Sequence, residues 1–442
     1  MNALISFLDS TARNIKFPCK IPTASLFVLA MVLMSPLSAA DWPQLLGPER
    51  NSRVSASEAP LEGLPAKLNV AWELACGEGY AGPAVAGDSV YAFDRVADKE
   101  RVRRIAKKDG QVIWSQQWPA EYSGGVDSDR GPRCVPTITK DHVILYGAAG
   151  QLVCLALASG DIVWSRSLKS EYQADDGYFG AGSSPLVVNQ SVIVNVGGKK
   201  KGGIVAVNLT DGKTIWESVG GEASYASPIA IQVNSSGDPK NQNATKQLVL
   251  VPTRLTTYAV DPAIGKVAFE FPFGARGPTV NGATPIQLAN GQVFMNASYG
   301  VGSFLVIPKS DAVDFIYKGS KLLSSQYSSP VAFGEIVFAS DGREDQAMGQ
   351  LRCIDVTKQK LLWESDKIGV AHLIAFTNTV LAIGIDGQLL LFEASPVKLA
   401  VRGSKKLDPG LYRALPAYSD GTLYLRSSAR GKGLILAVPL VQ

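Results

Sequence analysis

Hydrophobic and polar residues alternate with a period of two along most of this sequence, as in half-buried β-strands. Six segments show two short alternating runs joined by a tight turn: residues 82–93, 135–146, 184–195, 284–295, 329–340 and 415–426. Each of these segments has a proline at its first or second position, which suits the start of a strand because the missing N–H leaves no ladder bond unmade. No window has the apolar spacing of an amphipathic helix, so the pattern predicts an all-β chain.

A second pattern repeats between these hairpins. Five copies contain a short apolar strand, a turn with Gly or Asp, and a second strand with an aromatic residue: residues 104–116, 154–166, 206–218, 259–271 and 353–365. With one earlier strand, the aromatic series is Trp72, Trp114, Trp164, Trp216, Phe269 and Trp363. Ile316 and Val401 are expected to fill the same position in two weaker copies. A spacing of about 47 residues suits four short antiparallel strands, which is one blade of a β-propeller.

The blade count follows from the innermost strands. Eight of them are expected to begin near Pro83, Pro136, Pro185, Pro228, Pro285, Pro330, Leu373 and Pro416. The eighth unit ends without an outer strand, while the strand around Trp72 has no blade of its own, and pairing the two would remove two exposed edges. The sequence therefore predicts an eight-bladed β-propeller of four-stranded antiparallel blades, with the last blade closed by the N-terminal strand.

The first forty residues have the features of an export signal. Arg13, Lys16 and Lys20 precede an apolar run at 21–37, and small residues follow as far as Ala40. We expect cleavage near Ala40 and a periplasmic or other extracytoplasmic location. A retained anchor is the alternative, although the run is short for a membrane span. The chain then divides into a signal peptide (1–40), an N-terminal arm (41–69) and a propeller (70–442).

Charge and cysteine content exclude several classes of function. The formal net charge is only +4, with no long run of one sign, which argues against nucleic acid as a partner. The cysteines are isolated, without C-x-x-C, haem-attachment or zinc spacing, so the sequence indicates no metal site and no disulfide pairing. Of the two histidines, His142 falls in a hairpin turn and His372 near the expected axis, and no nucleophile partner is identifiable for either.

The repeats resemble the tryptophan-docking unit of pyrroloquinoline-quinone (PQQ) propellers, A-x-D-x-x-x-G-x-x-x-W. The glycine four positions before the aromatic residue is present as Gly110, Gly160, Gly212 and Gly265, whereas the aspartate appears only as Asp261 and Asp355. The resemblance covers about 370 residues. It implies that each indole packs across to the neighbouring blade and that each glycine adopts positive φ. Cys154 and Cys353 take the place of the small residue that opens the motif, which indicates a core position for both.

The proteins that this chain resembles fall into two functional groups. Quinoprotein alcohol and aldose dehydrogenases hold PQQ over the propeller axis, whereas other members are binding scaffolds, including an outer-membrane assembly factor. The alcohol-oxidising members typically have a disulfide between adjacent cysteines and often a calcium-ligating set, and neither can be matched in this chain. The assembly factor is normally lipid-anchored, but Asp41 stands where the lipid-bearing cysteine would be.

A candidate site is predicted from the loops that lead into the innermost strands. Three residues before each opening proline, or its counterpart, stand Tyr80, Arg133, Gly182, Tyr225, Gly282, Tyr327, Val370 and Arg413, and we call these positions the axial ring. Together with flanking residues, the candidate ligand-binding set is Tyr80, Arg130, Arg133, Tyr178, Tyr225, Asn281, Tyr327, His372, Tyr412 and Arg413. Arginine pairs with carboxylates and tyrosine offers apolar area with a hydroxyl group. The alternative is that these side chains plug the axis and pair with nearby acidic residues.

The sequence favours an exported, monomeric, non-catalytic binding or scaffold propeller whose funnel mouth takes a small anionic ligand, a peptide or a protein partner. We expect no cofactor, no catalytic residue and no metal, and contact with a membrane only through a partner. The alternative function is a PQQ-dependent alcohol or sugar dehydrogenase with PQQ and calcium.

Overall fold

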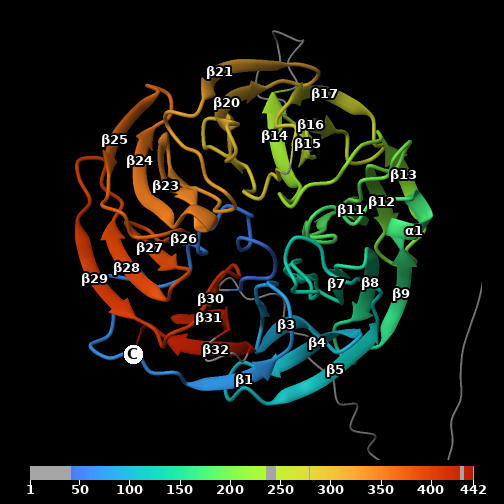
Figure 1. Ribbon diagram of the computed structural model, residues 1–442, viewed down its shortest axis with the longest axis horizontal. Helices are drawn as coiled ribbons and strands as arrows, with labels where there is room; N and C mark the ends of the chain where they lie inside the picture. The colour runs from blue at the N-terminus through green and yellow to red at the C-terminus, as the bar shows by residue number, and fades with distance from the viewer. Residues whose placement is uncertain (1–40, 235–244, 278, 429–432, 442) are drawn as a thin grey trace, which may run out of the picture. The chain divides into compact units, whose positions relative to one another are not determined.

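Eight four-stranded antiparallel sheets surround one axis in the computed structural model (Figure 1). The structure describes residues 41–234, 245–277, 279–428 and 433–441, so the predicted signal peptide lies outside the described residues. Within these ranges the helices are one short α-helix, α1 (Leu168–Tyr172), and one 3-10 turn, η1 (Glu344–Gln346). Neither is long and apolar enough to cross a membrane. The predicted all-β, eight-bladed propeller is confirmed.

Each blade runs from an inner strand at the axis to an outer strand at the rim. Blades 1 to 4 are β2 (Ala84–Ala86), β3 (Ser89–Val96), β4 (Lys99–Ala106), β5 (Val112–Pro119); β6 (Thr137–Ile138), β7 (His142–Tyr146), β8 (Gln151–Ala156), β9 (Ile162–Ser167); β10 (Leu186–Val188), β11 (Ser191–Asn195), β12 (Ile204–Asn208), β13 (Thr214–Ser218); and β14 (Ile229–Asn234), β15 (Thr245–Pro252), β16 (Thr256–Val260), β17 (Val267–Pro272). Blades 5 to 7 are β18 (Ile286–Gln287), β19 (Val293–Ala297), β20 (Gly302–Pro308), β21 (Val313–Gly319); β22 (Val331–Phe333), β23 (Ile336–Arg343), β24 (Met348–Asp355), β25 (Lys360–Glu364); and β26 (Ala371–Ala375), β27 (Thr379–Gly384), β28 (Gln388–Glu393), β29 (Val401–Lys406). Blade 8 is β30 (Ala417–Ser419), β31 (Thr422–Ser427), β32 (Gly433–Pro439) and β1 (Trp72–Cys76).

The N-terminal strand closes the last blade as predicted. β1 pairs antiparallel with β32 over its whole length, with Trp72 opposite Ala437. The inner strands begin one residue after their prolines, except in blade 7, where β26 begins at Ala371, before Leu373. Because β1 pairs with β32, β32 has a strand on both sides and β1 is not left as an isolated strand.

The aromatic series docks each blade onto the next. The indole Nε1 donates to a backbone carbonyl of the following blade in five pairs: Trp72 to Lys107, Trp114 to Leu157, Trp164 to Leu209, Trp216 to Pro262 and Trp363 to Ser395. In the first four of these pairs, the turn glycine of the following blade lies under the indole and has positive φ, as at Gly212 under Trp164. A Cβ atom at Gly212 would lie 2.7 Å from the Trp164 ring, so glycine is required for both its φ and its lack of a side chain.

The predicted alignment of the two weak copies was wrong by one and two residues. In the five blades with a correctly predicted aromatic on the outer strand, a β-bulge follows the residue that pairs with that aromatic. One example is the bulge between Ala206, which pairs with Trp216, and Val207. The same bulge in blade 5 places Tyr317, not Ile316, at the docking position. In blade 7 it places Gly403 there, not Val401.

A further indole outside the repeat register is also buried. Trp118 is 4% exposed and donates to the Glu100 carboxylate, which also accepts the backbone N–H of Ala148 in blade 2. Burial raises the pKa of Glu100 to about 7. Trp118 therefore belongs to the contact between blades 1 and 2, although it does not belong to the repeated aromatic series.

The N-terminal arm crosses the axis at the centre of the ring (Figure 1). The Arg50 guanidinium is buried and donates to the carbonyl oxygens of Pro185 and Pro228, beside inner strands of blades 3 and 4. Arg53 donates to the carbonyls of Ala332 in blade 6 and Phe376 in blade 7. Burial lowers the pKa of Arg50 to about 9. The arm thus plugs one end of the axis by hydrogen bonding to inner-strand carbonyls on both sides of it.

Candidate functional site

The axial ring lines a single cavity at the axis, which we call the funnel. Its volume is about 740 Å³, and every ring position except Val370 lines it. Blade 7 contributes His372 instead. Leu45 of the arm and Leu415 also line the cavity. The inference that equivalent loop positions converge on one volume is therefore correct.

Arg413 is the centre of an ion-pair network in the funnel. Its Nε and Nη2 atoms donate to the two carboxylate oxygens of Glu344 at 2.9 and 2.6 Å, and Nη1 donates to Asp127 Oδ2 at 3.2 Å. Tyr80 donates to the same Asp127 oxygen at 3.0 Å, and Tyr327 donates to Glu344 Oε2 at 2.8 Å. Burial alone would lower the pKa of Arg413, but the bonds and charge of Glu344 raise it. The guanidinium is therefore charged and already neutralised by protein carboxylates.

Arg133 is held by its own loop. Its guanidinium donates to the backbone carbonyls of Asp129 and Gly131, and one nitrogen lies 3.5 Å from Asp129 Oδ1. The guanidinium carbon also lies 5.5 Å from the centre of the Tyr80 ring, within cation–π range. Since Asp127, Glu344 and Asp345 also line the cavity, the funnel is close to neutral rather than basic.

The ring tyrosines present aromatic faces and fixed hydroxyl groups. Burial raises the pKa of both Tyr80 and Tyr225 to about 12 and also raises that of Tyr327, so all three are neutral phenols at ordinary pH. The Tyr225 hydroxyl accepts the backbone N–H of Phe179 at 2.7 Å. These rings form an amphipathic wall that combines apolar area with hydrogen-bonding groups.

His372 contributes a neutral imidazole to the funnel wall. Its Nε2 atom lies 2.8 Å from the carbonyl oxygen of Arg413, and because a carbonyl oxygen only accepts, Nε2 carries the proton. Burial lowers the pKa of the imidazole, which is therefore neutral. Its Nδ1 atom is buried and has no hydrogen-bond partner within the described residues. The ring packs against Tyr327 at a centroid distance of 5.7 Å.

Four of the predicted candidates do not line the funnel. Arg130 is paired with Glu78 at 2.7 Å outside it, and Tyr178 lines a neighbouring pocket. Asn281 is buried, and its amide donates to the carbonyls of Thr253, Arg254 and Phe273. Tyr412 lies in the hydrophobic core with its hydroxyl on the Asp408 carbonyl. The last two side chains hold loops rather than face the funnel.

Sequence reasoning missed the carboxylate that matters most. Glu344 lies in η1, at the tip of the long hairpin between β23 and β24, and this hairpin carries it over the axis. The signal was the acidic insertion at residues 341–346, which lengthens this hairpin relative to its counterparts. Asp127, in the loop before Arg133, is the second partner of Arg413.

The comparisons with known proteins agree with this architecture. A family model described as outer membrane protein assembly factor BamB matches residues 67–170 and 98–365. No curated protein sequence matches the chain.

Three similar solved structures contain the same fold. A quinohemoprotein alcohol dehydrogenase from Pseudomonas putida HK5 has a TM-score of 0.64 at 12% identity, covering 91% of this chain and 80% of its own. A europium-containing methanol dehydrogenase has a TM-score of 0.63 at 12% identity, covering 90% and 91%. BamB from Moraxella catarrhalis has a TM-score of 0.57 at 15% identity, covering 84% and 100%. At these identities the likeness establishes the fold alone.

Proposed function

Because the chain belongs to the family of PQQ-like propellers described by the assembly-factor model, we propose that it is an exported binding propeller without catalytic activity. Its funnel takes a segment of a protein partner. The chain is similar in fold both to BamB and to quinoprotein dehydrogenases, so the choice between a scaffold and an enzyme depends on the funnel itself.

The observation that supports this proposal is the pairing of Arg413. A small anion would have to displace Glu344 or Asp127 from a guanidinium that they already neutralise. A peptide needs no such exchange, because it can place apolar side chains on the tyrosine rings of the cavity wall. We therefore favour a peptide over the small anionic ligand that the sequence also allowed.

The funnel rim carries an apolar contact point. Val126 lines the cavity and is 73% exposed, and its backbone N–H is fixed by the carbonyl of Tyr178. An exposed apolar side chain beside partly buried aromatic rings is typical of a peptide-binding surface. Val126 also lies outside the ion-pair network of Arg413, so it can be changed without removing an ion pair or a side-chain hydrogen bond.

The funnel residues do not fit PQQ with calcium. PQQ carries three carboxylates, whereas the two funnel arginines already face protein carboxylates. Within the described residues, no group of three or more His, Cys, Asp or Glu side chains could hold a metal ion. The four cysteines in these ranges are free thiols, and none is adjacent to another in the sequence. We propose no step that uses the quinone.

A matched pair of substitutions tests the proposal. Val126→Asp should weaken capture of the partner from the cell envelope about tenfold, because it removes an apolar contact and adds a charge. Val397→Asp is the control, since Val397 is 80% exposed in the β28–β29 turn of blade 7 and does not line the funnel. Equal capture by both variants would contradict the proposed site.

The dehydrogenase alternative has its own test. The mature protein is incubated with PQQ and calcium, and quinone absorbance and dye reduction with alcohols or sugars are measured. We expect neither retained quinone nor dye reduction. Stoichiometric quinone together with dye reduction would establish the alternative.

A further inference from the structure

Another cavity lies at the opposite end of the axis from the funnel, and we call it the arm pocket. The funnel lies where the inner strands begin, whereas the arm pocket is lined by the turns that follow them, such as Ala289 after β18 and Gly334 after β22. Its volume is about 490 Å³, within the range for small-molecule sites. Glu49, Arg50 and Arg53 of the N-terminal arm form one of its walls, and none of the described residues lines both this pocket and the funnel.

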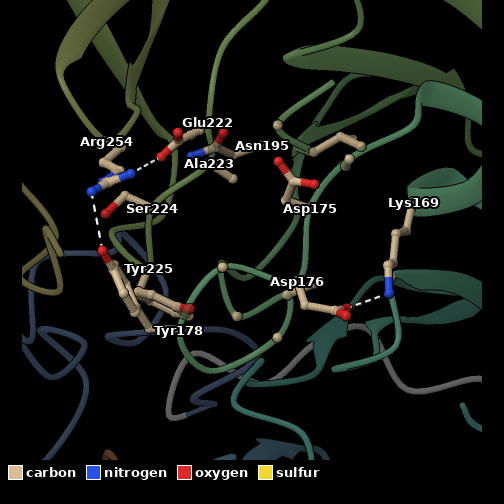
Figure 2. Close-up of a pocket in the computed structure, with 18 of the residues that line it drawn as sticks. Lys169, Asp175, Asp176, Tyr178, Asn195, Glu222, Ala223, Ser224, Tyr225 and Arg254 are labelled. Atoms are coloured by element: carbon tan, nitrogen blue, oxygen red, sulfur yellow. Dashed lines mark hydrogen bonds and ion pairs between the residues drawn. The ribbon is translucent and has the colours of Figure 1, made fainter. Parts of the chain in front are cut away.

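Cations elsewhere in the cavity walls are neutralised by carboxylates of the protein. In the funnel, Arg413 already faces two carboxylates. Figure 2 shows a smaller pocket of about 310 Å³ beside blade 3, in which Lys169 pairs with Asp176. Arg254 in the same pocket pairs with Glu222 (Figure 2). At each of these cations the protein itself supplies the anion.

Arg50 of the arm pocket, in contrast, is a buried cation that no carboxylate of the described residues neutralises. It is 4% exposed, and burial lowers its pKa to about 9, so it is still charged at pH 7. Its guanidinium donates to neutral oxygens, on Gln44, Ser184, Pro185 and Pro228. A charge without a counterion in such surroundings gives the pocket a positive field.

Arg53 is the cation that a ligand can reach. One face of its guanidinium lies on the Phe333 ring, with the guanidinium carbon 4.3 Å from the ring centre. Its Nη atoms donate to the carbonyls of Ala332 at 2.7 Å and Phe376 at 3.1 Å. Its Nε atom makes no hydrogen bond within the described residues and is not sealed from solvent. Burial lowers the pKa of Arg53, and no carboxylate opposes that effect. The N–H groups that the two carbonyls do not use are therefore available to an anion.

The rest of the wall selects among anions. Glu49 is exposed and is the one carboxylate among the described residues of the wall, so two positive charges face one negative charge. A net charge of this size favours a single anionic group over a multiply charged ligand. Gln232 of β14 and Gln247 of β15 lie opposite each other and add amide N–H donors. The exposed Ala230 supplies apolar surface for a short carbon chain.

We propose that the arm pocket binds a small organic carboxylate. The carboxylate accepts N–H groups of Arg53 in the positive field of Arg50, and the planar guanidinium matches a carboxylate in geometry. The carbon chain lies against the alanine side chains of the wall. This site is separate from the funnel, and it requires neither Arg413 nor the partner segment.

The experiment is a titration of the full mature chain with pentanoate at low salt, followed by ligand-observed NMR. Pentanamide has the same shape without the charge, and it and inorganic phosphate should bind at least about tenfold more weakly than pentanoate. Arg53→Gln should weaken pentanoate binding about tenfold or more, the fold-change expected for hydrogen bonds to a charged group. Glu49→Gln should strengthen it about threefold, because the variant removes a partly screened charge of the same sign as the ligand.

Two matched controls keep the result interpretable. Arg104→Gln removes another half-buried arginine that donates to neutral oxygens, on Ser89 and Leu157, and that lines none of the three cavities. Glu73→Gln removes an exposed carboxylate of β1 that also lines none of them. Both should bind pentanoate like the wild type.

The two glutamate variants decide the outcome even if Arg53→Gln fails to fold, because both changes are at exposed side chains. The proposal is overturned if pentanoate does not bind, or if pentanamide or phosphate binds as tightly. It is also overturned if a folded Arg53→Gln variant binds pentanoate like the wild type, or if Glu49→Gln and Glu73→Gln bind it equally.

Discussion

The docking of Trp164 on Gly212 of the next blade gives a stability prediction with an internal control. Gly212 and Gly334 both have positive φ, at 69° and 61°. A Cβ atom at Gly212 would lie 2.7 Å from the Trp164 ring, whereas one at Gly334 would meet nothing within 4 Å. Alanine at either position adopts an unfavourable backbone conformation, but only at Gly212 does it also collide with the indole.

These differences set the expected free energies of unfolding. Gly334→Ala should cost about 1–2 kcal/mol, the cost of a left-handed conformation. Gly212→Ala should cost about 1–3 kcal/mol more, because overpacking displaces the ring. Trp164→Ala should cost about 3–5 kcal/mol through the lost buried area and the lost bond to Leu209.

The double variant of Trp164→Ala with Gly212→Ala separates the two effects. Without the indole, the new methyl group has room, so the double variant should cost about 1–3 kcal/mol less than the sum of its parts. The assay is equilibrium unfolding in urea, compared at constant slope. Equal costs for the two glycine variants, or strict additivity in the double variant, would refute the docking account.

Three further predictions concern stability. The pKa of Glu100 is raised to about 7, so the folded state binds this proton more tightly than the unfolded state does. The stabilising contribution of the proton is therefore present below the unfolded pKa and is lost as pH rises through 7, which lowers the melting temperature between about pH 5 and 8. A Glu100→Gln variant should lack this fall, and a variant with the pH profile of the wild type would contradict the prediction. Trp118→Ala should cost about 3–5 kcal/mol in urea unfolding, as much as Trp164→Ala, because Trp118 is equally buried and bonded; a cost below about 1 kcal/mol would exclude an inter-blade role. A mature chain that begins at Gly77 lacks the arm and β1, and should lose several kcal/mol of stability; melting at the wild-type temperature would rule out closure by β1.

The fold could be predicted because local features determine it. Most blades repeat an opening proline, a turn and a docking aromatic, and the count of inner strands left one outer strand for the N-terminal segment to supply. What failed was a register detail. The segment from Leu305 to its partner Tyr317, like that from Leu391 to Gly403, is two residues longer than the segment from Cys154 to Trp164, so the spacing of the strong copies does not find the docking position in blades 5 and 7.

The candidate site could be predicted only in part. Equivalent loop positions lead to one cavity, so the ring residues were found. The partners of those residues depend on contacts distant in sequence: Asp127 meets Arg413 across 286 positions. Asn281 and Tyr412 immediately precede ring positions, yet they are buried away from the funnel. Side chains of an irregular loop do not alternate regularly between two faces as they do in a strand. The sequence alone therefore does not indicate which of two adjacent loop residues faces the cavity.

The most direct test of the funnel proposal is site-specific photo-crosslinking. A photoreactive phenylalanine analogue replaces Val126 at the funnel rim or, as the control, Val397 in the β28–β29 turn, and the full chain is irradiated in the cell envelope. We expect one protein partner, crosslinked through the same peptide segment, from position 126 and not from position 397. Crosslinks from position 397 alone, or none from position 126, would contradict the claim that the funnel is the binding site.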